Sequence, residues 1–192
     1  MKYLKGLLLT AAFFLAAPGF GQERFPIAES VMPPTRIEAL ESSQGVLLLK
    51  SFSEIGSLRT AGSVVVIEAL DLLAVKSQKR EFGVVLEFPR PGNSRRDGVA
   101  YIDYEEIDAL LQSMDELARS GENPTRLPNF EASYTTRDDI SFKVFNRQSG
   151  EISSSIEFER GSRGSIYLSL NDFAKARQII ANAKLKLDSL KQ

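Results

Sequence analysis

"GVAYIDYEEIDALLQSMDELA", residues 98–118, has a counterpart further along the chain in "SIYLSLNDFAKARQIIANAKL", residues 165–185. In both stretches a Tyr and an apolar residue lead into a polar residue that can cap a helix. An acidic residue follows three places later, and then come apolar residues at helical spacing. Aligning Tyr101 with Tyr167 keeps this match through the whole helical segment. The pattern predicts one structural unit that is written twice.

Periodicity and turn signals extend each unit upstream. In the first unit we expect strands over 46–52, 63–73, 80–88 and 99–103, then a helix over 104–119. In the second we expect strands over 129–135, 140–146, 151–159 and 165–169, then a helix over 170–190. The predicted class is α+β: duplicated ββββα units whose two antiparallel four-stranded sheets pack together with two helices. Repeats over 45–119 and 129–192, joined by a linker over 120–128, make a single domain.

Each helix begins with residues that can form a reciprocal cap, Asp103 with Glu106 and Ser169 with Asp172. Their charges are complementary, because the first helix is acidic and the second is rich in Lys and Arg. Two interpretations stay open: two separate solvated faces, or two helices that lie side by side. The apolar residues expected to be buried are Ile107, Leu110, Leu111, Met114 and Leu117 in the first helix, and Phe173, Ala176, Ile180, Ala183, Leu187 and Leu190 in the second.

The first residues indicate export. Lys2 and Lys5 precede an apolar run over 6–17, and small residues follow around Gly19 and Gly21, which is typical of a signal peptide over 1–21. No later segment approaches the length of about 20 apolar residues that a spanning helix needs. The formal net charge of −1 becomes −3 once the two lysines are removed. We expect a periplasmic or extracellular bacterial protein without a membrane span.

Residues 22–44 differ in composition from the repeats. Pro26, Pro33 and Pro34 prevent a long regular element, although a short helix capped by Thr35 fits the sequence "TRIEALESS". We expect either a flexible N-terminal lead or a strap that lies over a sheet.

The duplicated pattern, with "RGSRGSIYLSLNDFAKARQII" at 160–180 as a basic loop, a short strand and a capped helix, resembles the Whirly single-stranded-DNA-binding proteins and related transcriptional coactivators. The pattern covers most of the mature chain, whereas the residues themselves match only in this segment and its counterpart. The resemblance implies two antiparallel sheets under helices, with basic and aromatic residues that hold single-stranded nucleic acid. Export and a slightly acidic composition depart from that family.

The residue types limit the chemistry. Because the chain has no His and no Cys, histidine-dependent triads, thiol nucleophiles and the usual zinc sites are excluded. Asp138 and Asp139 fit a tight turn, where Asp is favoured for backbone reasons. A glycosidase with two carboxylates is compatible with the composition, but no pair is singled out. We therefore expect no enzyme activity, no cofactor and no metal.

The repeat also suggests a ligand surface. If Ala100, Ile102, Ile166 and Leu168 face the core, alternation turns Tyr101 and Tyr167 outward, each after an arginine-bearing loop. Guanidinium groups and rings together suit an anionic or planar ligand. Ordinary strand and hairpin surface is the alternative. The candidate ligand-binding residues are Arg90, Arg95, Arg96, Tyr101, Arg160, Arg163 and Tyr167. If a pseudo-twofold axis relates the two units, Tyr101 and Tyr167 with their arginine loops should form matching patches. The position of that axis decides whether the two patches merge into one.

Two functions are compatible with these observations. The first is an exported, non-catalytic binding or interaction module whose partner is a protein or an anionic envelope ligand. The second is a single-stranded nucleic-acid-binding protein of the Whirly type, which export and the net charge disfavour. A homo-oligomer is compatible with either function.

Overall fold

The computed structural model describes residues 35–60, 62–88, 98–120, 126–146, 150–158 and 164–191. These residues all belong to one compact body, Met32–Gln192, which holds both repeated units. The predicted signal peptide, residues 22–34 of the lead and residues 121–125 of the linker lie outside the described residues. So do five of the candidate ligand-binding residues: Arg90, Arg95, Arg96, Arg160 and Arg163.

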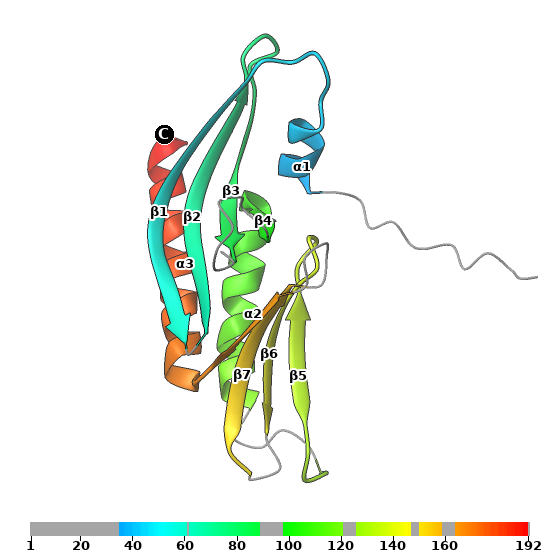
Figure 1. The fold of residues 1–192 in the computed structure, drawn as a ribbon, viewed down its shortest axis with the longest axis vertical. Helices are drawn as coiled ribbons and strands as arrows, with labels where there is room; N and C mark the ends of the chain where they lie inside the picture. Colours follow the sequence, from blue (N-terminus) through cyan, green and yellow to red (C-terminus); the bar gives the residue numbers. More distant parts are fainter. Residues whose placement is uncertain are drawn as a thin grey trace, which may run out of the picture. The chain divides into compact units, whose positions relative to one another are not determined.

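The described elements follow the predicted order (Figure 1). α1 (Arg36–Glu41) lies in the lead and precedes the first unit, which contains β1 (Leu48–Thr60), β2 (Ser63–Ala74), β3 (Lys79–Glu87), β4 (Val99–Asp103), the 3₁₀ helix η1 (Tyr104–Glu106) and α2 (Ile107–Ser120). The second contains β5 (Glu131–Thr135), β6 (Ile140–Asn146), β7 (Ile152–Phe158), β8 (Gly164–Leu168) and α3 (Leu170–Leu190).

Each unit forms its own antiparallel four-stranded sheet, with the strands in chain order: β1-β2-β3-β4 in the first sheet and β5-β6-β7-β8 in the second. The predicted α+β class and the duplication are confirmed. The main difference is in β1, which runs to Thr60, well past the predicted end at residue 52. A register shift between Glu54 and Gly56 lets the extended strand remain paired with β2.

The two helices share one core with both sheets. α3 contacts β1, β2 and β3 of the first sheet as well as β7 and β8 of its own unit, whereas α2 contacts β5 and β6. The residues predicted to point inward from the last strands, Ala100, Ile102, Ile166 and Leu168, are buried in this core. Along the helices, the predicted apolar faces are confirmed with two exceptions: Leu111 is partly buried, and Leu190 at the end of α3 is 45% exposed. The units are thus interlocked by their helices.

α2 and α3 lie side by side, so the interpretation as two separate solvated faces is wrong. Arg177 Nη2 on α3 lies 2.7 Å from Asp115 Oδ2 on α2. Lys184 Nζ lies 3.5 Å from Asp108 Oδ1 further along the pair. The complementary charges therefore meet across the seam between the helices. Among the described residues, no helix is long and apolar enough to cross a membrane.

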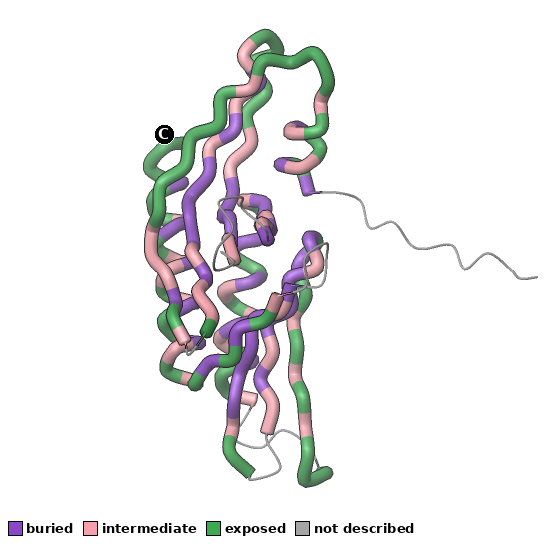
Figure 2. The backbone as a smooth tube through the Cα atoms, viewed as in Figure 1, coloured by how far each residue is buried: buried purple, intermediate pink, exposed green. Residues whose placement is uncertain are grey.

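The segment before β1 is a strap over the outer face of the first sheet, the face opposite α3 (Figures 1 and 2). Thr35 caps α1 as predicted, since its side chain accepts from the Glu38 backbone N–H and the Glu38 carboxylate accepts from the Thr35 backbone N–H. Ile37 and Leu40 are buried there in a second apolar cluster with Leu70, Leu72, Ala74 and Val85 of β2 and β3. Of the two interpretations of residues 22–44, the strap describes residues 35–41.

Candidate functional site

The outer faces of the two sheets carry Tyr101 and Tyr167, the two tyrosines for which the sequence predicts a ligand surface, and the two faces differ. On the first sheet, Tyr101 of β4 points away from the main core as predicted, but it packs against the cluster under α1. Its hydroxyl donates to Glu41 Oε2 at 2.9 Å and accepts from Lys50 Nζ at 3.1 Å. Lys50 also pairs with Glu41. Burial is the main cause that raises the pKa of Tyr101 above its usual value.

Gly83 of β3 makes the close approach of α1 possible. A Cβ atom at this position would stand 2.4 Å from Ile37 Cδ1 and 2.4 Å from the Ile102 carbonyl oxygen. No larger residue fits without movement of the strand or the helix, because one of the two clashes is with backbone. The glycine therefore provides the space in which Ile37 sits.

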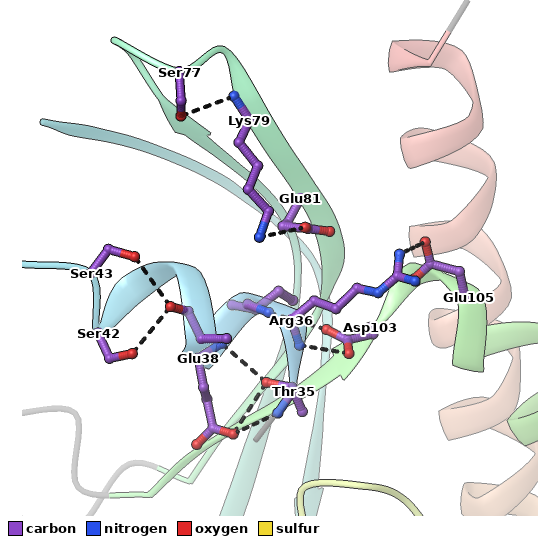
Figure 3. Close-up of polar contacts among 12 residues, drawn as sticks. Thr35, Arg36, Glu38, Ser42, Ser43, Ser77, Lys79, Glu81, Asp103 and Glu105 are labelled. Carbon is purple, nitrogen blue, oxygen red and sulfur yellow. Dashed lines mark hydrogen bonds and ion pairs between the residues drawn. The ribbon is translucent and has the colours of Figure 1, made fainter. Parts of the chain in front are cut away.

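Asp103 fastens α1 from the other side (Figure 3). Its carboxylate is almost completely buried and accepts from the backbone N–H of Arg36 at 2.9 Å and of Ile37 at 3.3 Å. The Arg36 guanidinium in turn bonds Glu105 at 2.7 Å. The negative charge lies at the positive N-terminus of α1, where free N–H groups need acceptors. Asp103 thus caps α1, which is distant in sequence.

This assignment corrects the predicted reciprocal cap of the first helix. Asp103 makes no side-chain capping bond to η1. Glu106 turns to the β5–β6 hairpin, where its Oε1 accepts from the Arg137 backbone N–H at 3.0 Å. In the second unit, Ser169 does cap α3, because its hydroxyl accepts from the Asp172 backbone N–H. The Asp172 carboxylate, however, accepts from the Ser169 hydroxyl and not from the Ser169 backbone N–H, so the reciprocal bond of a capping box is missing there as well. In the first unit both acids serve long-range contacts.

The turn between β5 and β6 completes a clasp between the units. Asp138 is buried, and its Oδ2 accepts from the Tyr101 backbone N–H at 2.7 Å. Asp139 adopts a positive φ of 55°, as expected for an Asp in a tight turn.

The acids at this junction serve structure. Burial is the main cause that raises the pKa of Glu106 above its usual value. Among the described residues, no three carboxylates are grouped so that they could hold a metal ion. These acids join the two units.

The outer face of the second sheet has no described helix over it. Tyr167 of β8 is 56% exposed there, and its ring meets Phe145 of β6 edge-on, with the centroids 6.5 Å apart. Contrary to the symmetry argument, the two tyrosines do not have matching surroundings. The reason is α1, because this helix precedes only the first unit.

The strand register arranges this second face in three rows of side chains. The rows are Thr135, Ser141, Glu157 and Ser165; Ser133, Lys143, Ser155 and Tyr167; and Glu131, Phe145 and Ser153. Seven of these eleven side chains carry a hydroxyl group, so the face can both donate and accept hydrogen bonds. Ser153 and Ser155 are buried between taller neighbours, which leaves the aromatic ring of Tyr167 standing above a floor of small residues.

The charges on this face are largely satisfied. Lys143 Nζ bonds Glu157 Oε2 at 2.6 Å and lies 3.9 Å from Glu131 Oε1. Ser155 also donates to Glu157 at 2.8 Å. Burial alone would raise the pKa of Glu157, but these two hydrogen bonds outweigh it and hold the pKa below its usual value. One Lys between two carboxylates makes the described part of the face slightly negative.

Comparison with protein-family models, curated proteins and solved structures finds no match. The arrangement of the two faces is therefore the basis for a functional assignment.

Proposed function

We propose that this protein is an exported, non-catalytic binding module that holds an envelope polymer on the outer face of the second sheet. One observation carries the proposal: of the two corresponding sheet faces, the one with Tyr101 is covered by α1 around that residue, while the one with Tyr167 has no described helix over it. The charged start, apolar run and small residues of 1–21 support export.

The chemistry of the face favours a polymer of sugar rings. Tyr offers a rigid surface that is apolar on its ring and polar at its hydroxyl, so it contacts a ligand with little loss of conformational entropy. The exposed hydroxyls of Ser133, Thr135 and Ser165 can bond a partner that itself carries hydroxyl or amide groups. A polysaccharide chain presents both features along its length, and a four-stranded face can contact several units of it.

Single-stranded nucleic acid is the second candidate, because the twofold ββββα pattern resembles the Whirly proteins. Much of the affinity for nucleic acid comes from Lys and Arg side chains that neutralise phosphates, and this part weakens steeply as salt rises. On the described face, Lys143 is paired with Glu157, which favours the first candidate over this one.

Calorimetric titration of the purified protein tests the proposal. The probes are a neutral N-acetylglucosamine oligomer, an anionic polygalacturonate and oligo(dT) at two salt concentrations. We expect a glycan to bind and Tyr167→Ala to weaken that binding, whereas Tyr167→Phe, which keeps the ring, retains most of it. Loss of one aromatic contact costs about 1–3 kcal/mol when the ligand is a nucleobase, or roughly 5- to 150-fold in affinity, and we expect a smaller loss of affinity for a glycan.

Leu185→Ala is the matched control, because Leu185 is also a large exposed residue, at 66%, but lies on α3. It should leave glycan binding unchanged. Salt-sensitive binding of oligo(dT) alone would favour the nucleic-acid candidate. Binding that survives Tyr167→Ala, or no binding by any probe, would contradict the proposed site.

A further inference from the structure

We infer that β1 is a self-association edge, through which two copies of this chain pair their first sheets antiparallel around a two-fold axis beside Phe52. The inference concerns the edge of the first sheet and does not depend on the face proposed for ligand binding. β1 is an end strand of its sheet, and six consecutive residues, from Leu49 to Glu54, are exposed. Such an edge is a template for pairing with another strand.

The hydrogen-bond pattern shows which residues would pair. The Val75 backbone N–H donates to the Leu47 carbonyl at 3.0 Å, which fixes the odd-numbered residues up to Ser53 as those whose backbone groups point to β2. The backbone groups of the even-numbered residues, Lys50 and Glu54 among them, are directed to the open edge. Their side chains share the α1 face, where Lys50 already meets Glu41.

Charge selects the register. In a pair centred beside Phe52, Lys50 of one copy lies opposite Glu54 of the other, and the two-fold axis makes this contact twice. A pair centred beside Lys50 or beside Glu54 would instead set like charges opposite each other, which is destabilising. Only the Phe52-centred register of this set brings opposite charges together.

The environment of Glu54 agrees with this choice. Within the chain, Glu54 lies opposite Glu68 of β2 in the strand register, so two carboxylates are neighbours on one face. Glu68 is only 8% exposed, and a like-charge pair across strands costs stability. No ion pair joins Glu54 to any residue in the described part of the chain. A Lys50 from a second copy would bring a positive charge to Glu54.

Apolar side chains are also exposed along β1, on both faces of the strand: Phe52 shares the face of Lys50 and Glu54, whereas Leu47 and Leu49 lie on the opposite face. Leu49 and Phe52 of β1 are 54% and 49% exposed, and Leu47 just before the strand is 66% exposed. Burial of such side chains is the dominant favourable term in association. The partner is therefore a second copy of this chain, which offers both the complementary charges and an equally exposed set of apolar side chains along its edge.

Light scattering after size exclusion, on the purified full-length mature protein, tests the inference. We expect a mass twice that of one chain. Glu54→Lys sets a lysine against Lys50 at both symmetric contacts and should weaken the dimer about tenfold or more. It should not destabilise the monomer, because the introduced lysine faces Glu68 within its own sheet. Glu116→Lys, the same charge change at an exposed position on α2, should leave the dimer intact.

A charge exchange gives the decisive result. Lys50→Glu should also be monomeric, but its mixture with the Glu54→Lys chain should form a 1:1 dimer, since both contacts then pair opposite charges. Circular dichroism checks that each variant is folded. A parent protein that is monomeric up to about 100 µM, a range in which specific dimers assemble, would overturn the inference. So would a dimer that both single variants retain, or a mixture that does not associate.

Discussion

Replacement of Ile37 by Ala should release α1 from the first sheet without unfolding the protein. Ile37 is fully buried and fills the space above Gly83. In the interior of a domain, truncation of Ile to Ala costs about 2–5 kcal/mol of unfolding free energy. α1 is a short peripheral element, however, and it can detach while the rest of the protein stays folded. The loss of unfolding free energy therefore cannot exceed the free energy with which the strap is docked.

That docking free energy can be worked out from the contacts. Burial of Ile37 and Leu40 contributes about 3–6 kcal/mol. The two hydrogen bonds to the buried Asp103 carboxylate contribute about 1.5–3 kcal/mol each, or about 3–6 kcal/mol together. Fixing the six residues of α1 costs about 6–12 kcal/mol of conformational entropy. The terms nearly cancel, so loss of most of one buried side chain should shift the strap to its released state.

Hydrogen exchange measured by mass spectrometry distinguishes the two outcomes. In Ile37→Ala we expect the amides of residues 36–41 to lose protection, while those of β2 and β6 keep theirs. The pKa of Tyr101, which burial now raises, should move toward its ordinary value as the hydroxyl becomes exposed. The reasoning is refuted if residues 36–41 stay protected and the global unfolding free energy falls by the full 2–5 kcal/mol expected for a core position.

Three further results are expected. Gly83→Ala should force α1 or the backbone of β4 to move and lower the unfolding free energy by about 1–3 kcal/mol in urea; an unchanged midpoint would mean that the strap adapts freely. Asp138→Ala leaves the Tyr101 N–H without its acceptor and should cost about 1–3 kcal/mol, so equal stability of variant and parent would argue against the clasp. Glu106 has a raised pKa in the folded state, so its contribution to stability is complete below its ordinary pKa of 4.5 and is lost as the pH rises through the raised value. The difference in stability between Glu106→Gln and the parent should therefore be more favourable to the variant at neutral pH than at about pH 4. An equal difference at both pH values would count against a buried, charged Glu106.

The architecture could be predicted from the sequence because both the helical spacing and the strand alternation of apolar residues are clear in it. β6 has the predicted bounds, Ile140–Asn146, since apolar and polar residues alternate there between two turn signals. The inward positions Ala100 and Ile102 follow from the apolar helix that comes next. β1 was predicted too short, because its second half, with Gly56 and Ser57, has weak alternation and is held as a strand by pairing with β2.

The candidate site was less accessible from sequence. An acid that precedes a helix suggests a local cap, whereas the partners of Asp103 lie 67 and 66 residues away, on α1. Nothing local distinguishes the two cases. One signal was available: Gly83 in the middle of a strand often marks a close approach of other atoms. It would have indicated that something covers the face with Tyr101, and so that the two tyrosines have different roles.

The most direct test of the proposed function is the map of amide chemical-shift changes when the parent protein is saturated with the glycan probe that binds it. We expect the largest changes on the outer face of the second sheet, at Lys143, Ser155 and Tyr167, and none at residues 36–41 or 99–103 beneath the strap. Changes centred on α1 and β4, with the second sheet unaffected, would contradict the assignment of the open face as the ligand face.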